Sequence, residues 1–264
     1  AERERARSEL AVASRIQLSA LPTVRPPFSG CDDFGLSASM HPAKEVGGDF
    51  YDFFLIDQDH CGVVIADVSG KGVPAALFMM RVKALLNQLL REDLSPDQVL
   101  ARANDGLCED NEAGMFVTVW LGVLDLRSGK LVYANGGHNP PLYRHADGSV
   151  EWMRDWSGLL LGSFEGVPYR VFERTMIRGD SLILYTDGVT EAMDASDHCY
   201  GDERLFQLVE RECDGYPASV SGVIEEDVRA FAEGADQADD ITLLVLRYDG
   251  QENGPAASAA GNRG

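Results

Sequence analysis

Short runs of apolar residues, bounded by Gly, Asp, Asn or Pro, recur through the middle and the end of the chain. Runs of this length that are rich in Val, Leu, Ile, Phe and Tyr are typical of β-strands. They predict strands at residues 36–42, 49–57, 61–68, 115–126, 130–137, 181–186 and 241–248. The tetrapeptide Asp57-Gln58-Asp59-His60 predicts a hairpin turn between the second and third of them.

Apolar residues at helical spacing predict helices in the remaining segments. These helices cover residues 1–21, 74–92, 96–110, 202–211 and 218–233. Pro74 and Pro96 stand in a first helical turn, where the missing N–H needs no partner. The order is strands, helices, strands, helices and a last strand, without regular βαβ alternation. This order favours antiparallel sheets with helices packed outside over a doubly wound parallel sheet.

The two ends of the chain differ in composition from its middle. Residues 1–21 predict an amphipathic helix that ends at Pro22, and Pro26-Pro27 enforce an extended linker after it. Residues 250–264 hold no bulky apolar side chain, so they predict a disordered tail. We therefore expect a linker helix (1–21), one domain (22–249) and a tail (250–264), and we expect the helix to follow a further module. The apolar stripe of the helix is Leu10, Ala13, Ile16 or Gln17, and Ala20.

Charge and cysteine content narrow the function classes. The chain has 264 residues with 43 Asp plus Glu against 23 Lys plus Arg, a formal charge of −20. Such a negative field excludes nucleic-acid binding and opposes contact with anionic membranes, so partners are expected among proteins and small molecules. The apolar runs fall short of the roughly 20 residues that span a bilayer. Five scattered cysteines without a CxxC pair predict a reduced, cytoplasmic protein.

Aspartates stand at the ends of four predicted strands: Asp49, Asp67, Asp187 and the pair Asp239-Asp240. If these ends meet, like-charge repulsion requires cations, and oxygen-only ligation suits Mg²⁺ or Mn²⁺. Two such ions about 3.5–4 Å apart can activate a water and hold a phosphoryl group. The alternative is that these aspartates only form turns, because spacing alone does not show that they converge.

Other catalytic motifs fail on inspection. The segment Ser69-Gly70-Lys71-Gly72 is slightly similar to a phosphate-binding loop, but Ile65 stands where the first glycine is required and Gly72 replaces Ser or Thr. The five histidines form no HxxxH or HExxH pattern, and no GxSxG nucleophile motif is present. The aspartates therefore remain the candidate centre for chemistry.

Five segments carry aspartate- and glycine-rich motifs in a fixed order: PAKEVGGDFYDFF (42–54), VVIADVSGKGVPAALFM (63–79), ANGGHNPP (134–141), LYTDGVTEA (184–192) and ADDITLLVL (238–246). In this order they resemble the motifs of metal-dependent protein phosphatase 2C. They are most similar to its bacterial branch of sporulation stage II E and sigma-factor-regulator phosphatases, and the resemblance covers residues 30–248. It implies an α+β fold, a four-layer αββα sandwich of two antiparallel sheets flanked by helices, with a binuclear metal site at one edge.

The resemblance also implies ligands for two Mn²⁺ or Mg²⁺ ions. Asp67 would bridge both ions, and the Val68 carbonyl would be a further ligand. Asp49 would bind one ion and Asp187 the other. The second ion would also take one of the Asp239-Asp240 pair; the family pattern Asp-Asn-x-Thr favours Asp239 and leaves Asp240 as a neighbouring group.

Lys44 and His138 are two further candidates for catalysis. Lys44 lies five residues before Asp49, where many family members carry a phosphate-binding Arg, so it joins Asp49 and Asp67 in the expected catalytic set. A lysine cannot offer the bidentate fork of an arginine, and the alternative for Lys44 is a solvated surface residue. His138 is left out of the catalytic set because its loop is mainly structural in the family.

The function implied by the resemblance is that of a cytoplasmic Ser/Thr protein phosphatase. A metal-activated water would attack phosphorus directly, and the substrate would be a phosphorylated anti-sigma-factor antagonist or similar regulator. Members of this branch follow a sensory module through a helix like residues 1–21, which can pair in a homodimer; a solvated leader is the alternative. Two other functions stay open: a catalytically silent pseudophosphatase that acts as a binding module, and a metal-dependent small-molecule phosphoesterase.

Overall fold

The computed structural model describes residues 2–23 and 34–250, so the predicted extended linker and the tail from residue 251 lie outside the described residues. The described strands form two five-stranded sheets in which all pairs of neighbouring strands are antiparallel. In spatial order, the first sheet contains β1 (Phe34–His41), β10 (Ile241–Tyr248), β9 (Ser181–Tyr185), β6 (Leu142–Arg144) and β7 (Val150–Trp152). The second contains β2 (Phe50–Leu55), β3 (His60–Val68), β4 (Val117–Asp125), β5 (Lys130–Gly136) and β8 (Phe172–Thr175).

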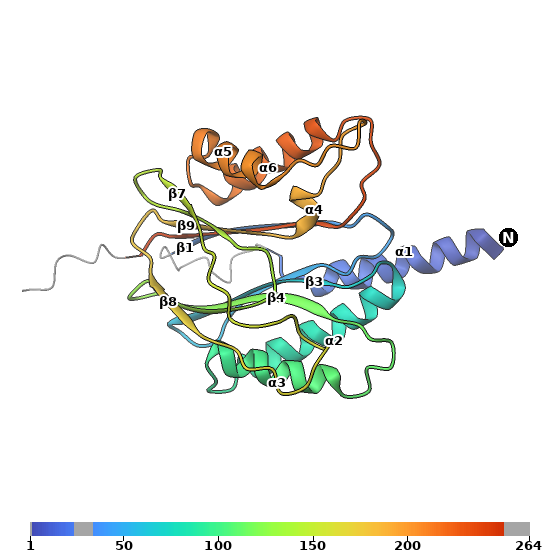
Figure 1. Cartoon of the computed structure of the whole chain (residues 1–264), viewed down its shortest axis with the longest axis horizontal. Coiled ribbons are helices and arrows are strands. Elements are labelled where there is room, and N and C mark those ends of the chain that lie inside the picture. The colour runs from blue at the N-terminus through green and yellow to red at the C-terminus, as the bar shows by residue number, and fades with distance from the viewer. Residues whose placement is uncertain (1, 24–33, 251–264) are drawn as a thin grey trace, which may run out of the picture.

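Helices cover the outer face of each sheet, which gives four layers (Figure 1). The pair α5 (Asp202–Glu212) and α6 (Pro217–Phe231) packs on the first sheet, and the pair α2 (Val73–Leu89) and α3 (Pro96–Cys108) packs on the second. The predicted αββα sandwich is therefore confirmed. Among the described residues no helix is both long and apolar enough to cross a membrane.

The five long helices and seven of the strands follow the sequence patterns closely. The helix α3 begins where expected, because Ser95 caps it and its backbone N–H donates to the Gln98 side chain at 3.1 Å. The strand β3 is buried along most of its length, which explains its continuous apolar run: one face meets the other sheet and the other face meets α2. The strands β6, β7 and β8 were not predicted, because three or four residues are too short to show a period.

The N-terminal helix α1 (Glu2–Ala20) projects from one end of the sandwich (Figure 1). Gln17, and not Ile16, faces the domain: Gln17 is buried, whereas Ile16 is 60% exposed. The Gln17 amide donates to the Gly47 carbonyl at 2.6 Å and accepts from the Gly47 N–H at 3.1 Å. This side chain therefore completes two backbone hydrogen bonds just before the segment Gly48-Asp49.

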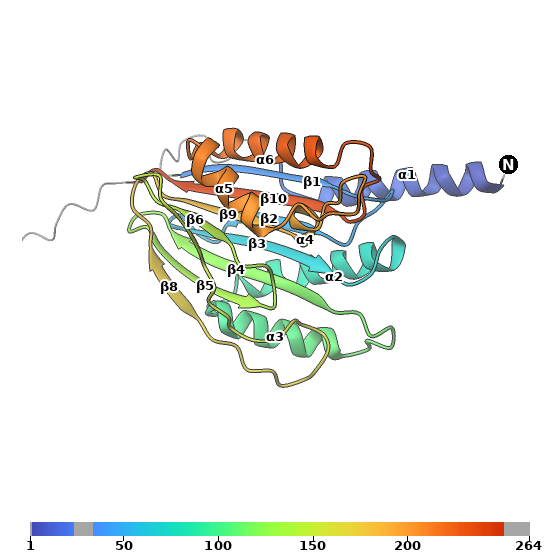
Figure 2. The same cartoon turned by 45° about the horizontal axis from the view of Figure 1, so that its top comes forward.

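Strand register brings the predicted site residues to the end of the sandwich from which α1 projects (Figure 2). In the second sheet Phe50 pairs with Ala66, so Asp49 and Asp67 follow side by side. In the first sheet Leu243 pairs with Tyr185, so Thr242 and Thr186 follow side by side. The short helix α4 (Asp187–Thr190) begins at this end, so Asp187 opens a helical turn after β9.

Candidate metal centre

Asp49 joins the two sheets at this end. Its carboxylate oxygen Oδ2 accepts hydrogen bonds from the hydroxyls of Thr186 at 2.6 Å and Thr242 at 2.7 Å. All three residues are buried. The Thr242 N–H in turn donates to the Thr186 hydroxyl oxygen at 3.0 Å, which fixes the direction of that hydroxyl. Two threonines of the first sheet thus orient an aspartate of the second.

Asp240 makes the reciprocal connection with backbone N–H groups. Its Oδ2 accepts from Gly48 at 2.7 Å and Asp49 at 3.4 Å, and its Oδ1 accepts from Ala43 at 2.8 Å. A Cβ atom on Gly188 would overlap the Asp240 carbonyl, so only glycine permits this approach. Asp240 is engaged in holding the segment that carries Asp49, which supports its interpretation as a neighbouring group.

The carboxylates at this end of the sandwich, among them Asp67, Asp49 and Asp187, are surrounded by like charges. Burial, followed by the negative charges of Asp187, Asp239 and Asp240, raises the pKa of Asp67 to about 7. Burial and then the charge of Asp67 raise the pKa of Asp49 well above its usual range, against the two threonine hydrogen bonds. Burial and then nearby carboxylates also raise the pKa of Asp187. Strand register places Asp49 beside Asp67 at the end of the sandwich where Asp187 and Asp239 also stand, and their role as metal ligands stays a prediction.

A basic side chain, that of Lys71, also lies at this centre. It was not among the site residues predicted from the sequence. Its Nζ lies 2.8 Å from Asp239 Oδ2 and donates to the Ala238 carbonyl at 2.6 Å. Its hydrogen bond to Asp239 raises the pKa of Lys71. Lys44, the predicted phosphate-binding residue, lies exposed in the bend between β1 and β2. The segment Ser69-Gly70-Lys71-Gly72, which does not fit a phosphate-binding loop, was the sequence signal that could have pointed to Lys71.

The backbone of Val68, also a predicted ligand, packs against the segment before Asp49. A Cβ atom on Gly48 would stand 2.8 Å from the Val68 carbonyl oxygen, which is closer than real Cβ contacts allow. Glycine at position 48 therefore lets this carbonyl lie against the Asp49 segment. Glycine beside an aspartate permits such a close approach, and here the approaching group is protein backbone.

His138 links the two sheets beneath the aspartates. Its Nε2 lies 3.1 Å from the Tyr185 carbonyl, which only accepts, so Nε2 carries the hydrogen. Burial lowers the pKa of His138 to about 4, so the ring is neutral and Nδ1 accepts from the Thr118 hydroxyl at 2.8 Å. Thr118 pairs with Asp67 across β3 and β4. The His138 side chain thus connects β4 with β9, and its absence from the catalytic set stays a prediction.

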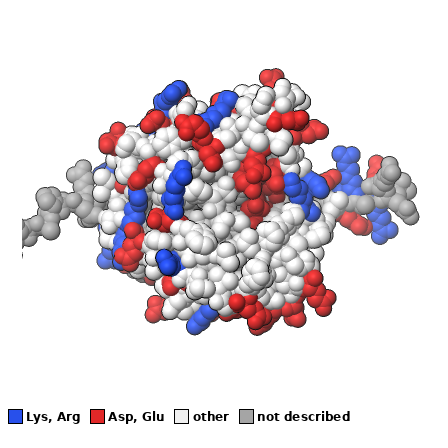
Figure 3. All heavy atoms as spheres, in the orientation of Figure 1, with Lys and Arg blue, Asp and Glu red and all other residues white. Residues whose placement is uncertain are grey.

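The donor set suits a hard divalent cation. Figure 3 shows acidic side chains gathered over the end of the sandwich where α4 lies in Figure 1. Carboxylates that raise one another's pKa are stabilised by dications, and oxygen donors without thiolate or imidazole are typical of Mg²⁺ and Mn²⁺ sites. Among the residues that the structure describes, no three His, Cys, Asp or Glu side chains are already close enough to hold an ion as they are placed.

The sandwich and its acidic end define the class: this is the fold of PP2C-type phosphatase domains. The SiaA-PP2C domain of Pseudomonas aeruginosa superposes with a TM-score of 0.83 at 22% identity, over 94% of this chain and 99% of that one. The catalytic domain of the serine/threonine phosphatase PstP, solved with two manganese ions, has a TM-score of 0.59 at 15% identity, over 81% and 98%.

A family model for stage II sporulation protein E matches residues 57–249, and the chain belongs to that family. Phosphoserine phosphatase RsbU of Bacillus subtilis is 29% identical over 91% of this chain and 70% of its own length. Phosphoserine phosphatase RsbP of the same organism is 28% identical over 90% of this chain and 57% of its own length. The predicted branch and enzyme class are thus confirmed at the level of the family.

Proposed function

We propose that this chain is a metal-dependent protein serine/threonine phosphatase whose centre is the acidic end of the sandwich. The observation that carries the proposal is that aspartates from four strand ends lie at one end of the sandwich. Strand register places Asp49 beside Asp67, and Asp240 accepts hydrogen bonds from the segment that carries Asp49. Membership of a family whose relatives include phosphoserine phosphatases supports the same conclusion. In this proposal residues 22–249 form the phosphatase domain.

The ligands of two Mn²⁺ or Mg²⁺ ions would be Asp67 between them, the Val68 carbonyl, Asp49, Asp187 and Asp239. When bound, such ions lower the pKa of a water and polarise the phosphoryl oxygens. Asp239 is preferred over Asp240 as a ligand. The reason is that Asp239 is half-buried beside Lys71, whereas the Asp240 carboxylate is buried and engaged by three backbone N–H groups.

The other residues of the centre position groups for this reaction. Thr186 and Thr242 hold Asp49 through its Oδ2. Lys71 neutralises part of the carboxylate charge at Asp239. Lys44, exposed five residues before Asp49, would attract the phosphate dianion as a point charge.

The proposed substrate is a phosphorylated regulatory protein of the anti-sigma-factor antagonist type, in the cytoplasm. We also propose that an upstream sensory module acts through α1, and that α1 pairs with its copy in a homodimer. Two observations support this. Gln17 hydrogen-bonds Gly47 beside the metal-binding segment, and Val12 and Ile16, one helical turn apart, are 44% and 60% exposed. An exposed apolar stripe on a projecting helix is typical of an interface.

Turnover of p-nitrophenyl phosphate by the full chain, with and without Mn²⁺, tests the proposal. We expect Mn²⁺-dependent release that is lost in Asp67→Asn and retained in Asp125→Asn, a matched change at the opposite end of the sandwich. A pseudophosphatase would release no phosphate under any of these conditions. A small-molecule phosphoesterase would hydrolyse small esters at least as well as a phosphoserine protein.

A further inference from the structure

A pocket of about 280 Å³ opens directly beside the acidic centre. Its walls are the C-terminal half of α6, the short helix α4, the end of β1 and the loop of residues 232–240. Gly188 and Asp239 line it and also belong to the acidic centre. The pocket is therefore continuous with the place where a phosphate would bind.

Apolar residues make up half of the residues that line the pocket. They are Ala192, Met193, Val228, Ala232, Ala235, Ala238 and Ile241. Several polar groups of the wall are engaged with one another: His41 lies 3.4 Å from Glu225, and the Gln237 amide donates to the backbone carbonyls of His41 and Asp239, both at 2.7 Å. These bonds hold the loop in place. An occupant meets the apolar groups and, beside them, the charged side chains of Arg229 and Asp236.

The volume suits one side chain. An apolar cavity of about 150 Å³ accepts a benzene molecule, whereas sites for whole small-molecule ligands run from roughly 300 to 1,000 Å³. A pocket of about 280 Å³ thus has room for a leucine, methionine or phenylalanine side chain and is small for a nucleotide or an organic cofactor.

We propose that this pocket binds a large apolar side chain of the protein substrate, within three residues of the phosphoserine. The inference rests on the proposed phosphatase function and adds to it a determinant of substrate choice. An extended peptide advances about 3.3 Å per residue, so a chain whose phosphoserine reaches Asp239 places its near neighbours at the pocket mouth. Burial of an apolar side chain against the apolar part of the wall stabilises the complex. An aspartate at the same position would meet three carboxylates, those of Glu225, Asp236 and Asp239, against the one guanidinium of Arg229, so repulsion opposes it.

Synthetic phosphoserine heptapeptides test the inference on the full chain in Mn²⁺. Each of the six flanking positions carries Leu, Ala or Asp in turn, and kcat/KM is measured from phosphate release. We expect Leu to raise kcat/KM over Ala by roughly tenfold or more at one flanking position, the range typical of added methylenes in an apolar pocket, and Asp to lower it there. Equal kcat/KM for Leu, Ala and Asp at every position would overturn the inference.

Two variants that fill the pocket link this preference to its wall. In Ala232→Phe and, independently, Ala235→Phe, the Leu-to-Ala ratio of kcat/KM should fall to near one. The ratio does not depend on how much of the variant is folded. Ala218→Phe, on the exposed first turn of the same helix, should keep the wild-type ratio. A ratio that persists in both filled variants would refute the pocket, whereas a wild-type chain that releases no phosphate from any ester would refute the phosphatase function itself.

Discussion

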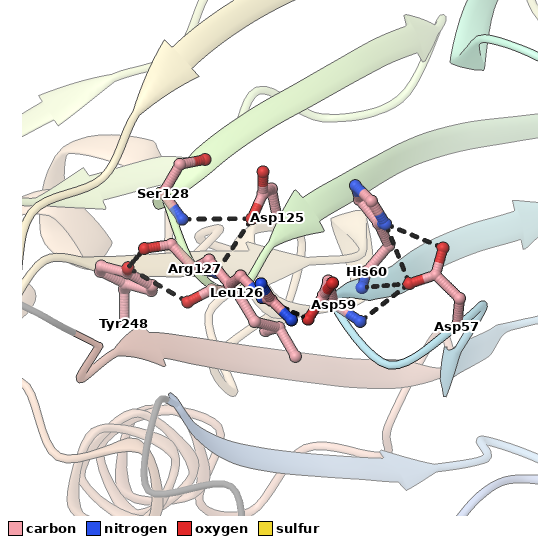
Figure 4. A network of polar contacts seen from close by, with 8 residues as sticks. All are labelled: Asp57, Asp59, His60, Asp125, Leu126, Arg127, Ser128 and Tyr248. Carbon is pink, nitrogen blue, oxygen red and sulfur yellow. Dashed lines mark hydrogen bonds and ion pairs between the residues drawn. The ribbon is translucent and has the colours of Figure 1, made fainter.

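Aspartates stand beside strand termini at both ends of the sandwich, but the groups around their carboxylates differ between the two ends. At the end opposite the metal centre, Asp57 and Asp125 also flank strand ends (Figure 4). Asp57 accepts from the N–H groups of Asp59 at 2.8 Å and His60 at 2.9 Å. These hydrogen bonds, that of Asp59 first, lower the pKa of Asp57. The carboxylate there is ionised and closes the turn between β2 and β3.

Asp125 is held in the same way in the next turn. Its Oδ1 accepts from the N–H groups of Arg127 at 2.9 Å and Ser128 at 3.1 Å. Partial burial works against these bonds, and the net effect is a lowered pKa for Asp125. The Tyr248 hydroxyl donates to the Leu126 and Arg127 carbonyls, both at 3.2 Å, which ties this turn of the second sheet to the last strand of the first.

At the metal end, by contrast, Asp49 is buried and Asp67 and Asp187 are half-buried, and partial or full burial together with nearby carboxylates raises the pKa of each. Asp57 and Asp125 meet N–H donors that favour the charged form, whereas Asp67 meets further carboxylates. Whether a strand-end aspartate forms a turn or belongs to a metal centre therefore depends on the groups that surround its carboxylate. Neither residue type nor position in the strand distinguishes the two.

The strongest test of this contrast is Asp67→Asn. We expect phosphate release in Mn²⁺ to fall at least about a hundredfold, because the variant removes a charged group that would bind both ions. The metal-free variant should be at least as stable as the wild type, since a repelled carboxylate is replaced by a neutral amide. Activity is measured with p-nitrophenyl phosphate and stability by urea unfolding in chelator. A variant with wild-type turnover would show that Asp67 is not part of the centre.

Thr242→Val tests whether the inter-sheet hydrogen bonds position Asp49. The change keeps the shape of the side chain and removes one of two hydroxyl donors to Asp49 Oδ2. Loss of such a supporting group typically weakens a metal site by about 10–100-fold. We expect the Mn²⁺ concentration for half-maximal activity to rise by that factor.

Thr242→Ser serves as the matched control, because it keeps the hydroxyl. It should restore Mn²⁺ affinity close to the wild-type value. If Thr242→Val and Thr242→Ser weaken Mn²⁺ binding equally, the effect comes from packing and the positioning role is wrong.

The free energy of unfolding should depend on pH in the direction set by the raised pKa of Asp67. In the unfolded chain the pKa of Asp67 is near 4, and in the folded chain it is about 7. Between these values the folded state binds more protons, so the free energy of unfolding should fall as pH rises from about 4 to 7, by roughly 3 kcal/mol in metal-free protein.

Saturating Mn²⁺ should abolish this decline, because a cation replaces the protons, and Asp67→Asn should reduce it. Urea unfolding across this pH range measures the effect. The turns at the other end have lowered pKa values, so their contribution to stability is lost as pH falls below about 4. A metal-free stability that rises from pH 4 to 7 would contradict the raised pKa of Asp67.

The layers of the fold could be predicted from sequence because long elements repeat their pattern. The apolar run that forms β3 and the capped start of α3 each specify their element locally. The strand β6 and the helix α4 could not be predicted in this way, because tertiary contacts with β9 and β10 decide them.

In the candidate site, too, some features could be predicted from the local sequence and others depend on tertiary contacts. The strand-end position and flanking glycines of Asp49 and Asp187 are visible in the sequence, and register then brings them together. The two threonine donors, Thr186 and Thr242, lie 137 and 193 positions from Asp49 in the sequence. Lys71 and Asp239 are likewise far apart in the sequence. Only the packed sheets bring these pairs together. Whether an aspartate faces N–H groups or other carboxylates is likewise a tertiary property.

The smallest expected effect comes from Asp125→Ala at the opposite end. The change leaves the N–H groups of Arg127 and Ser128 without their acceptor, and the turn is partly open to water, so the free energy of unfolding should fall by about 1 kcal/mol. Turnover and Mn²⁺ dependence should stay at the wild-type level. The change in stability at unchanged activity is the reverse of the result expected for Asp67→Asn. If Asp125→Ala instead altered Mn²⁺ dependence, the two ends would be coupled through β3 and β4, and the separation between turn-forming and metal-binding aspartates would not hold.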